Sequence, residues 1–370
     1  MDVFLWVYII AIAICFVTSW WWFSLLKTVP PPPDDTDFSD AKITILIPAR
    51  NEEHNLGTLL SSIRSQAFQP YEIIVIDDHS VDRTAEIARE HGARVVTAPD
   101  LPDDWFGKPW ACTNGVAEAT GDWLLFLDAD THLETGAMEK FAALTVTAPE
   151  AVHAIGPYHR VREPYEQLSS FFNVIMVLGM NAFTVRGWEA DEIGLFGQCM
   201  LVKKADYETI GGHERVKRIV LENFHLARDF EEAGIERCCY IGKGTISMRM
   251  FPTNYRDMAD GWGKGFVSGA GNTPASALFG ISIWLSGLIM STISLFLLPF
   301  ASPLTAGFIL GLYLLNAGQI LFLFKTVGNF SFWNAALFPV SLAFYQVLFF
   351  KSMHRGRRKG EIFWKDRDVS

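Results

Sequence analysis

The sequence predicts an α/β domain with a mostly parallel sheet, set between apolar segments long enough to enter a membrane. Three observations predict this fold. Half of the 370 residues are hydrophobic. The charged residues fall mostly between positions 34 and 265, so apolar ends flank a polar middle. Within that middle, short apolar runs alternate with helical patterns, which is typical of parallel strands joined by helices.

The N-terminal apolar segment, residues 1–28, is expected to be a retained membrane anchor. The run from Val3 to Leu26 carries no charge. At ~1.5 Å per residue it is long enough to cross a bilayer. It contains three consecutive tryptophans near its end and is followed by Lys27, residues typical of a membrane interface. A cleaved signal peptide is the alternative, but the acidic start, the length and the lack of a small-residue cleavage site argue against it.

A proline-rich linker, residues 29–41, leads to the middle domain, which we expect at residues 42–271. The predicted strands are 43–47, 72–76, 94–97 and 123–127, and the predicted helices are 53–65, 82–91 and 110–119. Such alternation implies helices on both faces of the sheet, with ligands bound beyond the carboxyl ends of the strands.

The C-terminal part, residues 272–350, contains three apolar segments, 278–300, 304–324 and 332–350, and is followed by a basic tail, residues 351–370. Positive charge marks the cytoplasmic side of a membrane. Three full crossings would put the tail outside if the first span delivers the middle domain to the cytoplasm. We therefore expect one of these segments to be re-entrant or to lie in the interface, with a helix break possible at Pro299, Pro303 or Pro339. The prediction is a multi-pass cell-membrane protein with a cytoplasmic domain.

Two carboxylates, Asp128 and Asp130, follow the apolar strand predicted at 123–127. Their i, i+2 spacing at a strand end predicts that both project to one side. Mg²⁺ and Mn²⁺ are held by one or two carboxylates together with substrate phosphates. The pair therefore predicts a metal site for a nucleotide diphosphate. A solvated turn is the alternative.

Composition argues against other classes. A net charge of -10, with no basic stripe outside the tail, argues against a nucleic-acid partner. The five cysteines show neither metal-binding spacing nor a disulfide framework, as expected for reduced cytosolic thiols. No Gly-rich basic loop follows the first strand, which argues against a nucleotidyl or phosphosugar transferase. A non-catalytic membrane scaffold stays open as an alternative.

Three motifs in this order, Pro48–Glu53, Asp77–Asp82 and Asp128–Asp130, resemble the family 2 glycosyltransferases, which have a GT-A fold. The resemblance covers the middle domain and continues through further short segments: Gly107-Lys108, Asn114-Gly115, Gly197-Gln198, Gly211–His213 and Trp262–Gly265. Within the family, three segments most resemble the bacterial 4,4'-diaponeurosporenoate glycosyltransferases of carotenoid synthesis: Gly156–His159, Val177–Asn181 and Trp364-Lys365.

The resemblance implies a UDP-sugar donor, most simply UDP-glucose, a divalent metal (Mg²⁺ or Mn²⁺), and transfer with inversion. It implies that Asp78 contacts the uracil, that Glu52 and Lys108 lie at the nucleoside, and that Asp128 binds the ribose or the metal. Asp130 would ligate the metal. Further donor contacts are expected at Ala49 and at Lys264, whose charge would stabilise the leaving UDP.

The expected position of the catalytic base departs from the family pattern. Many relatives carry Glu-Asp before a helix, where this chain has Glu222-Asn223. Asparagine cannot act as a base, so Glu222 or His225 is the candidate. A carboxylic acid acceptor, with a pKa of ~4 to 5, is already ionised at neutral pH and needs no base. We therefore hypothesise a carotenoid carboxylic acid as acceptor and a glycosyl ester as product; the alternative is a hydroxyl of a hopanoid, diacylglycerol or ceramide-like lipid.

The acceptor side is expected to be apolar. The run 171–183 is too apolar for an exposed helix and short for a spanning one. It fits a lipid entrance, an interfacial segment or a buried core helix. Residues 254–268 are expected to lie at the membrane interface. Because Asp260 and Gly261 precede Trp262, the Gln-x-x-Arg-Trp motif of processive synthases is absent, which favours a single transfer. The expected acceptor contacts are Gln198, Trp262, Phe171 and Met180.

Overall fold

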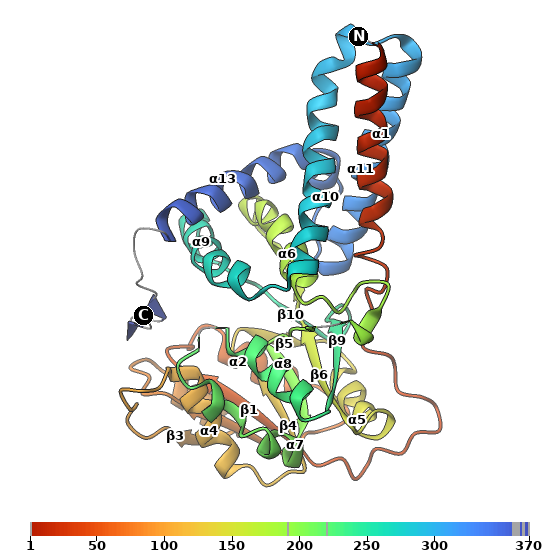
Figure 1. Ribbon diagram of the computed structural model, residues 1–370. Helices are drawn as coiled ribbons and strands as arrows, with labels where there is room; N and C mark the ends of the chain where they lie inside the picture. Colours follow the sequence, from red (N-terminus) through yellow and green to blue (C-terminus); the bar gives the residue numbers. More distant parts are fainter. Residues whose placement is uncertain (1, 191, 220, 357–362, 365–366, 369–370) are drawn as a thin grey trace. The chain divides into compact units, whose positions relative to one another are not determined.

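The computed structural model describes residues 2–190, 192–219, 221–356, 363–364 and 367–368 (Figure 1). Its chain forms two compact units. The α/β unit contains residues 27–158, 192–250 and 360–370, and the helical unit contains residues 1–26, 159–191 and 251–359. The segments 159–191 and 251–271, which we expected inside the α/β domain, therefore group with the helices.

The α/β unit is built on a seven-stranded sheet in the order β3-β2-β1-β4-β8-β6-β9. Its strands are β1 (Ile43–Ala49), β2 (Glu72–Asp77), β3 (Arg94–Thr97), β4 (Trp123–Leu127), β6 (Ala151–Gly156), β8 (Cys199–Lys203) and β9 (Glu236–Ile241). β1 pairs in parallel with β2 and β4, while β8 runs antiparallel to β4 and β6. The predicted α/β class with a mostly parallel sheet is confirmed, with one reversed strand in the middle.

The apolar runs of β1 and β4 are explained by their central places in this sheet. Every residue of β4 is buried, and Ile45 of β1 lies in register with Leu125 of β4. A strand with neighbours on both edges and a cover on both faces needs apolar side chains throughout. At the carboxyl end of β1, Ala49 pairs with Asp77 of β2, so the polar segments that follow both strands begin at the same level.

Helices follow the strands of the α/β unit in the predicted alternation. They are α2 (Leu56–Arg64), α3 (Thr84–Glu90), α4 (Gly107–Glu118), α5 (Ala137–Thr147), α7 (Lys204–Thr209), the 3-10 turn η3 (Gly212–Val216) and α8 (Glu222–Glu232). α2 and α3 begin later than predicted because the residues before them bond to each other. The Glu53 N–H donates to Asp82 Oδ2 at 3.1 Å, and the Glu52 N–H donates to Thr84 Oγ1 at 2.8 Å.

The acidic pair lies in a turn. β4 ends at Leu127, and Asp128 to Asp130 connect it to β5 (Thr131–Leu133). The directions of the two side chains are therefore set by this turn and not by strand alternation, which corrects our expectation.

β5 pairs antiparallel with β10 (Ile246–Met248). The remaining short strands are β7 (Tyr158–His159), β11 (Phe363–Trp364) and β12 (Arg367–Asp368).

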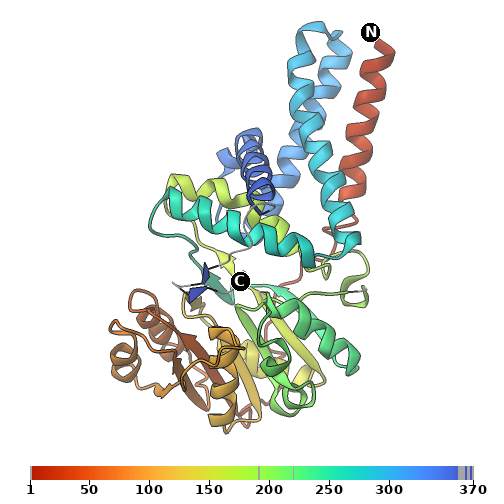
Figure 2. The ribbon, with the colours of Figure 1, turned by 60° about the vertical axis from the view of Figure 1, so that its left-hand side comes forward.

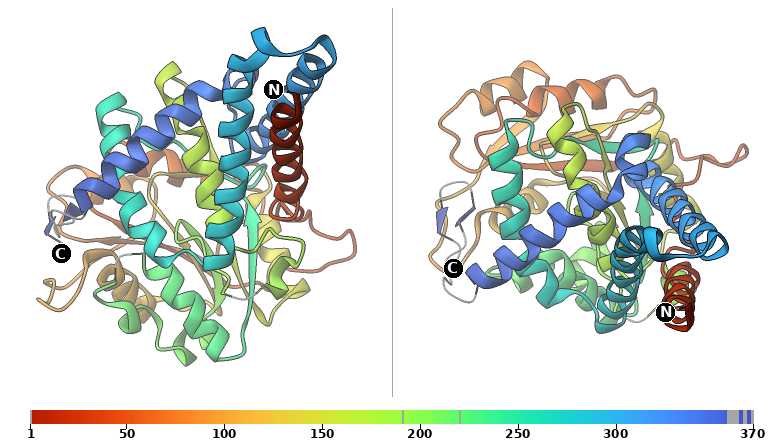
Figure 3. Two further views of the ribbon diagram at one scale, coloured as in Figure 1. Left: turned by 45° about the horizontal axis from the view of Figure 1, so that its top comes forward. Right: turned by 90° about the horizontal axis from the view of Figure 1, so that it is seen from above.

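The helical unit contains three long helices that run side by side, α1, α10 and α11 (Figure 3). Its elements are α1 (Asp2–Ser19), η1 (Pro164–Ser169), α6 (Ser170–Gly179), η2 (Gly187–Glu189), α9 (Tyr255–Asn272), α10 (Ala275–Ser294), η4 (Leu295–Phe300), α11 (Pro303–Val327), α12 (Phe332–Ala336) and α13 (Phe338–Gly356).

Within the described residues, two helical segments are long and apolar enough to cross a membrane, Ala275–Phe300 and Pro303–Val327. α1 is shorter than the predicted anchor because the helix stops at Ser19 and the tryptophans after it form turns. The third predicted C-terminal segment is divided into α12 and α13, with Pro339 as the second residue of α13, where a missing N–H costs no helical bond.

The apolar run that we associated with the acceptor forms α6, and nearly all of α6 is buried inside the helical unit. Phe171 packs against Trp284 and Phe324, with ring centroids 5.7 and 5.4 Å apart. α9 and α13 lie beside α6 (Figure 2), and Trp262 of α9 stacks on Phe172 with centroids 5.0 Å apart. This structure therefore matches the core-helix interpretation of α6.

Candidate active site

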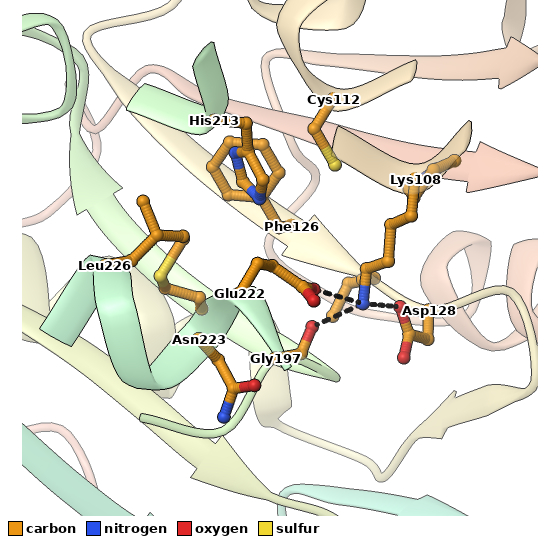
Figure 4. A pocket seen from close by; sticks show the side chains of 12 residues that line it. Lys108, Cys112, Phe126, Asp128, Gly197, His213, Glu222, Asn223 and Leu226 are labelled. Carbon is orange, nitrogen blue, oxygen red and sulfur yellow. Dashed lines mark hydrogen bonds and ion pairs between the residues drawn. The ribbon is translucent and has the colours of Figure 1, made fainter. Parts of the chain in front are cut away.

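A largely buried ammonium group is the centre of a charged cluster near the carboxyl ends of the strands (Figure 4). Lys108 Nζ lies 2.8 Å from Asp128 Oδ1 and 3.5 Å from Glu222 Oε1, and it donates a hydrogen bond to the Gly197 carbonyl at 3.1 Å. An ammonium group has three N–H donors. All three have a protein partner here, so Lys108 joins two carboxylates and a carbonyl.

The members of this cluster come from four separate parts of the sequence. Lys108 is the second residue of α4, and Asp128 follows β4 directly. β8 pairs antiparallel with β4, and the Asp128 N–H donates to the Gln198 carbonyl at 3.0 Å. This pairing brings Gly197, the residue before Gln198, close to Asp128. Glu222 is the first residue of α8. The reversed strand β8 is therefore what closes the site, and the predicted alternation of strand and helix did not include it.

The charges of the cluster perturb one another. Burial alone would lower the pKa of Lys108, but Asp128 and Glu222 outweigh it and raise that pKa well above its ordinary value. Lys108 therefore stays protonated. Burial, and then the negative charge of Asp128, raise the pKa of Asp130 to about 6. Asp130 is thus a carboxylate without enough positive charge near it, which is the condition that a divalent cation relieves.

The start of α8 fixes Glu222 and Asn223 in different ways. Leu221, just before the helix, adopts a left-handed backbone with φ of 63°. Glu222 points to Lys108, whereas the Asn223 side-chain amide donates to the Leu195 carbonyl (Figure 4). Both residues line one small cavity, and His225 is not part of its lining. Of the two candidate bases, Glu222 is the one that reaches the cluster.

The cavity beside this cluster is also lined by residues that were not among the predicted site residues. Cys112, Phe126 and His213 are buried there. The Tyr207 hydroxyl lies 2.7 Å from His213 Nδ1 and accepts a hydrogen bond from the His213 N–H at 2.9 Å. Burial, and then the charge of Lys108, lower the pKa of His213 to about 3, so this imidazole is neutral. The Gly211-Gly212 pair, both with positive φ, was the sequence signal for this turn.

The cavity itself is about 10 Å³, which is room for no more than one water. A nucleotide sugar does not fit inside it.

Of the candidate nucleoside residues, Asp78 and Glu52 lie at the carboxyl edge of the sheet and outside the small cavity, whereas Lys108 lines the cavity. Asp78 is buried, its N–H donates to the Ala49 carbonyl at 2.9 Å, and Arg50 Nη1 donates to the Asp78 carbonyl at 2.6 Å. Arg50 Nη1 also lies 3.8 Å from Asp78 Oδ2. Glu52 Oε2 accepts a hydrogen bond from Asn55 at 2.8 Å. Pro48 is the residue of this edge that lines the cavity.

The candidate metal ligands are Asp128 and Asp130. In the described part of the chain, no three His, Cys, Asp or Glu side chains are grouped closely enough to hold a metal ion by themselves. A site with two carboxylates leaves several coordination positions for water and for the oxygens of a diphosphate, as Mg²⁺ prefers. The donor set therefore fits a metal that binds together with its nucleotide.

The candidate acceptor residues are divided between the two units. Gln198 follows Gly197 in the α/β unit, and its Oε1 is buried without a hydrogen bond to any residue that the structure describes. Phe171, Met180 and Trp262 are all buried in the helical unit. Lys264 falls in α9, where its side chain lies outside the described residues.

Comparison with solved structures bears on the fold. A mannosyltransferase from Pyrobaculum calidifontis, solved with GDP-Man and Mn²⁺, superposes with a TM-score of 0.50 at 15% identity, covering 93% of this chain and 96% of that one. Glucosyl-3-phosphoglycerate synthase from Mycobacterium tuberculosis, with Mn²⁺, UDP-glucose and phosphoglyceric acid, gives a TM-score of 0.45 at 18% identity over 68% of this chain and 89% of that one. The second overlap is too low to carry an argument; the first shows that the fold is shared.

The fold has the GT-A architecture, and the sequence comparisons define the protein as a glycosyltransferase. The sequence matches the model of glycosyl transferase family 2 over residues 44–211. It is 34% identical to 4,4'-diaponeurosporenoate glycosyltransferase of Staphylococcus aureus strain MRSA252 over 337 residues, which are 90% of each chain. The protein of strain USA300 is 33% identical over the same share. The chain belongs to glycosyl transferase family 2, and the scaffold and nucleotidyltransferase alternatives lose their support.

Proposed function

We propose that the protein transfers a hexose, glucose, from UDP-glucose to a carotenoid carboxylic acid in the membrane and so forms a glycosyl ester. The full-length relatives named above act, by their names, on 4,4'-diaponeurosporenoate, a carotenoid carboxylate. Two helices apolar enough to span a bilayer support a membrane protein with access to such a substrate. We assign the α/β unit to the cytoplasm, where the donor is made.

The Lys108 cluster is the observation that carries this proposal. One ammonium group pairs with both Asp128 and Glu222. Asp128 belongs to the acidic turn, and Glu222 is the candidate base. A transferase must hold a donor that leaves with negative charge next to an acceptor oxygen that attacks. A permanent positive charge between these two positions lowers the repulsion between them as the transition state forms.

The donor is expected to bind along the edge formed by β1, β2 and β4, with Asp78 and Glu52 at the nucleoside. Asp130, with Asp128, would hold Mg²⁺ or Mn²⁺. When bound, the metal would supply positive charge that stabilises the leaving diphosphate. Asp130 is the better ligand of the two because Asp128 already shares its charge with Lys108.

The transfer itself needs one substitution at the anomeric carbon, with inversion. A carboxylate oxygen of the acceptor attacks, the new C–O bond forms, and the bond from the anomeric carbon to the phosphate oxygen breaks. UDP leaves with the electron pair. A carboxylate acceptor carries no proton at neutral pH, so no general base is required. This fits Asn223, whose amide is used to bind the Leu195 carbonyl.

A second acceptor class is favoured by the position of Glu222. Its carboxylate lines the cavity, and a lipid hydroxyl acceptor, as in a hopanoid, diacylglycerol or ceramide-like lipid, must lose a proton during attack. Glu222 would take that proton. The two candidate functions therefore differ in whether Glu222 is essential.

The test uses purified full-length protein with UDP-glucose, Mg²⁺ or Mn²⁺, and a matched pair of carotenoids that differ only in a terminal acid or alcohol. UDP release and a hexose-sized mass increase on the carotenoid are measured. We expect transfer to the acid, and we expect Glu222→Gln to keep most of that activity. Preference for the alcohol, or complete loss of transfer to the acid in Glu222→Gln, would contradict the carboxylate proposal.

A further inference from the structure

A groove lies between α9 and α13 inside the helical unit, and its described lining contains no residue proposed above to bind the donor. It has a volume of about 230 Å³. Its apolar lining comes mainly from α13, with Phe344, Val347 and Leu348. Its polar lining is Arg256 and Asp260 on α9 and Lys351 on α13. The groove thus combines an apolar wall with two cations and one carboxylate.

The two cations of the groove are exposed and have no ionic partner in the described part of the chain. No carboxylate of a described residue lies within 4.0 Å of Arg256 or Lys351, although Asp260 is only one helical turn from Arg256. The lining therefore has a net positive charge. In the sequence, four more cations follow shortly after Lys351: Arg355, Arg357, Arg358 and Lys359.

α13 is apolar on two faces. Its buried face includes Phe338, Leu342 and Tyr345. A second set of side chains points away from the unit at helical spacing: Leu337 just before the helix, then Val340, Val347 and Phe350, which are 59–67% exposed. An outward apolar stripe that ends in lysine is typical of a helix in contact with a lipid surface.

We propose that the groove binds the headgroup of an acidic phospholipid, with the phosphate between Arg256 and Lys351 and the acyl chains along the exposed side of α13. The apolar stripe supplies the surface for the chains, and the unpaired cations supply the charge for the phosphodiester. Asp260 would accept a hydrogen bond from a headgroup hydroxyl, which selects a glycerol headgroup over a bare phosphate. This site is separate from the transfer reaction and does not depend on the proposed acceptor.

The test is native mass spectrometry of the full-length protein from mixed micelles with equal amounts of phosphatidylglycerol and phosphatidylcholine. The ratio of the two retained lipids is measured. We expect phosphatidylglycerol to be enriched, and we expect Arg256→Gln and Lys351→Gln each to lower the ratio about fivefold, since one cation near a lipid surface contributes about 1 kcal/mol. Val347→Asp places a carboxylate in the groove and is expected to lower the ratio by at least as much.

Two matched controls separate the groove from general effects of charge. Val340 is 62% exposed and Val347 is 67% exposed on the same helix, but Val340 does not line the groove. Val340 belongs to the stripe that contacts the acyl chains, which both lipids have, so Val340→Asp is expected to lower the retention of both lipids and to keep their ratio. Arg162→Gln, which removes an exposed cation elsewhere in the unit, is expected to keep the ratio too. Equal enrichment in wild type and Arg256→Gln, an equal fall of the ratio in Val340→Asp, or displacement of the lipid by the carotenoid acid at micromolar concentration would each overturn the proposal.

Discussion

Two sets of polar side chains, one in each unit of the molecule, differ in charge. In the α/β unit, the partly buried cluster of Lys108, Asp128 and Glu222 is fully charged. In the helical unit, one buried chain of hydrogen-bonded side chains is neutral. The Trp284 indole N–H donates to Gln319 Oε1 at 3.1 Å, and the Gln319 amide donates to Ser19 Oγ at 2.9 Å, so α1, α10 and α11 share one chain of hydrogen bonds.

This difference follows from what each unit must do. A buried charge costs far more free energy than a buried amide or hydroxyl unless it is paired, so charges are retained where a charged ligand must be met. The neutral groups of the helical unit satisfy one another and fix which helix faces meet, without the cost of removing a full charge from water. The comparison indicates that the charged cluster is suited to meet a charged ligand and that the neutral chain is suited to packing.

The largest effect is expected from removal of the candidate metal ligand. Asp130→Asn should lower kcat about 10³-fold, since charge stabilisation of the leaving group is usually the largest contribution to such a reaction. Chelation of divalent metal in the wild type should have a similar effect. Because burial and Asp128 raise the pKa of Asp130, its ionised form destabilises the metal-free fold. The same variant should therefore unfold at a higher temperature than wild type at pH 7 without metal.

The control for that variant is Asp122→Asn, an exposed carboxylate before the same strand. It should change neither kcat nor the unfolding temperature. Full activity of Asp130→Asn at saturating metal would remove Asp130 from the metal site.

Loss of the bridging cation should affect stability and activity together. Lys108→Met leaves Asp128 and Glu222 without their shared partner and should lower the free energy of unfolding by about 3 kcal/mol, the low end for a broken buried pair because Lys108 is 23% exposed. Urea unfolding measures this loss. Lys108→Arg should recover much of the stability, because it keeps the charge.

A double variant tests whether the loss comes from the unpaired charges. Lys108→Met combined with Asp128→Asn should be more stable than Lys108→Met alone, since one uncompensated carboxylate is removed. Lys204→Met is the matched control, because Lys204 also donates to a backbone carbonyl, at 2.8 Å, but lies away from the cluster. If the double variant were less stable than the single one, Lys108 would act through packing and not through charge.

Acid should destabilise the α/β unit through His213. Its pKa is about 3 in the folded protein, lowered by burial and by Lys108, against about 6.5 in an unfolded chain. The unfolded chain therefore binds a proton first, so stability is highest above pH 6.5 and falls as the pH drops toward 3. The expected loss at pH 5 is about 2 kcal/mol for this residue. Unfolding by urea at pH 7.5 and at pH 5 measures it.

The pH test has its own pair of variants. His213→Gln should reduce the difference in unfolding free energy between the two pH values, whatever its effect at pH 7.5. His54→Gln should leave that difference unchanged, because the His54 side chain is 90% exposed. Equal pH dependence in all three proteins would mean that His213 is protonated in the folded state.

The fold was predictable because its signals are local. The apolar runs at Ile43 and Trp123 need burial on both faces, and the helical patterns between them leave a parallel sheet as the arrangement that provides it. The reversed strand β8 was not predictable in this way, because its partner β4 is some seventy residues earlier in the chain. The direction of β8 is set by its pairing with β4, which no local pattern indicates. Pro339, one of three prolines named as possible breaks, lies at the start of α13, just after the end of α12.

The candidate site was predictable in residue identity but not in contacts. The motifs named Lys108, Asp128 and Glu222, yet nothing local to any of them indicates that one ammonium group joins the other two. His213 and Cys112 were missed as lining residues because a buried histidine or cysteine in sequence looks the same whether it faces a core or a cavity. Chemistry can be read from residue types, whereas proximity depends on long-range pairing.

The smallest effect is expected in the neutral chain of the helical unit. Gln319→Leu removes the partner of both Ser19 and Trp284 and should cost about 1 kcal/mol, since neutral hydrogen bonds among apolar helices contribute little each. Thermal unfolding in detergent measures the loss, and hydrogen exchange of the α1 amides should rise, because Ser19 is the residue of α1 that Gln319 holds.

Gln346→Leu makes the same amide-to-methyl change on α13, where the side chain has no hydrogen bond to a described residue. It should therefore leave α1 exchange unchanged. A loss of unfolding free energy from Gln319→Leu as large as that from Lys108→Met would contradict the contrast between the units. Leaving a neutral group without its partner would then cost as much free energy as leaving a charged group without one. A loss near zero together with faster α1 exchange would instead support the contrast between the units. In that case the hydrogen bonds would fix the position of α1, and the surrounding apolar contacts would supply the stability.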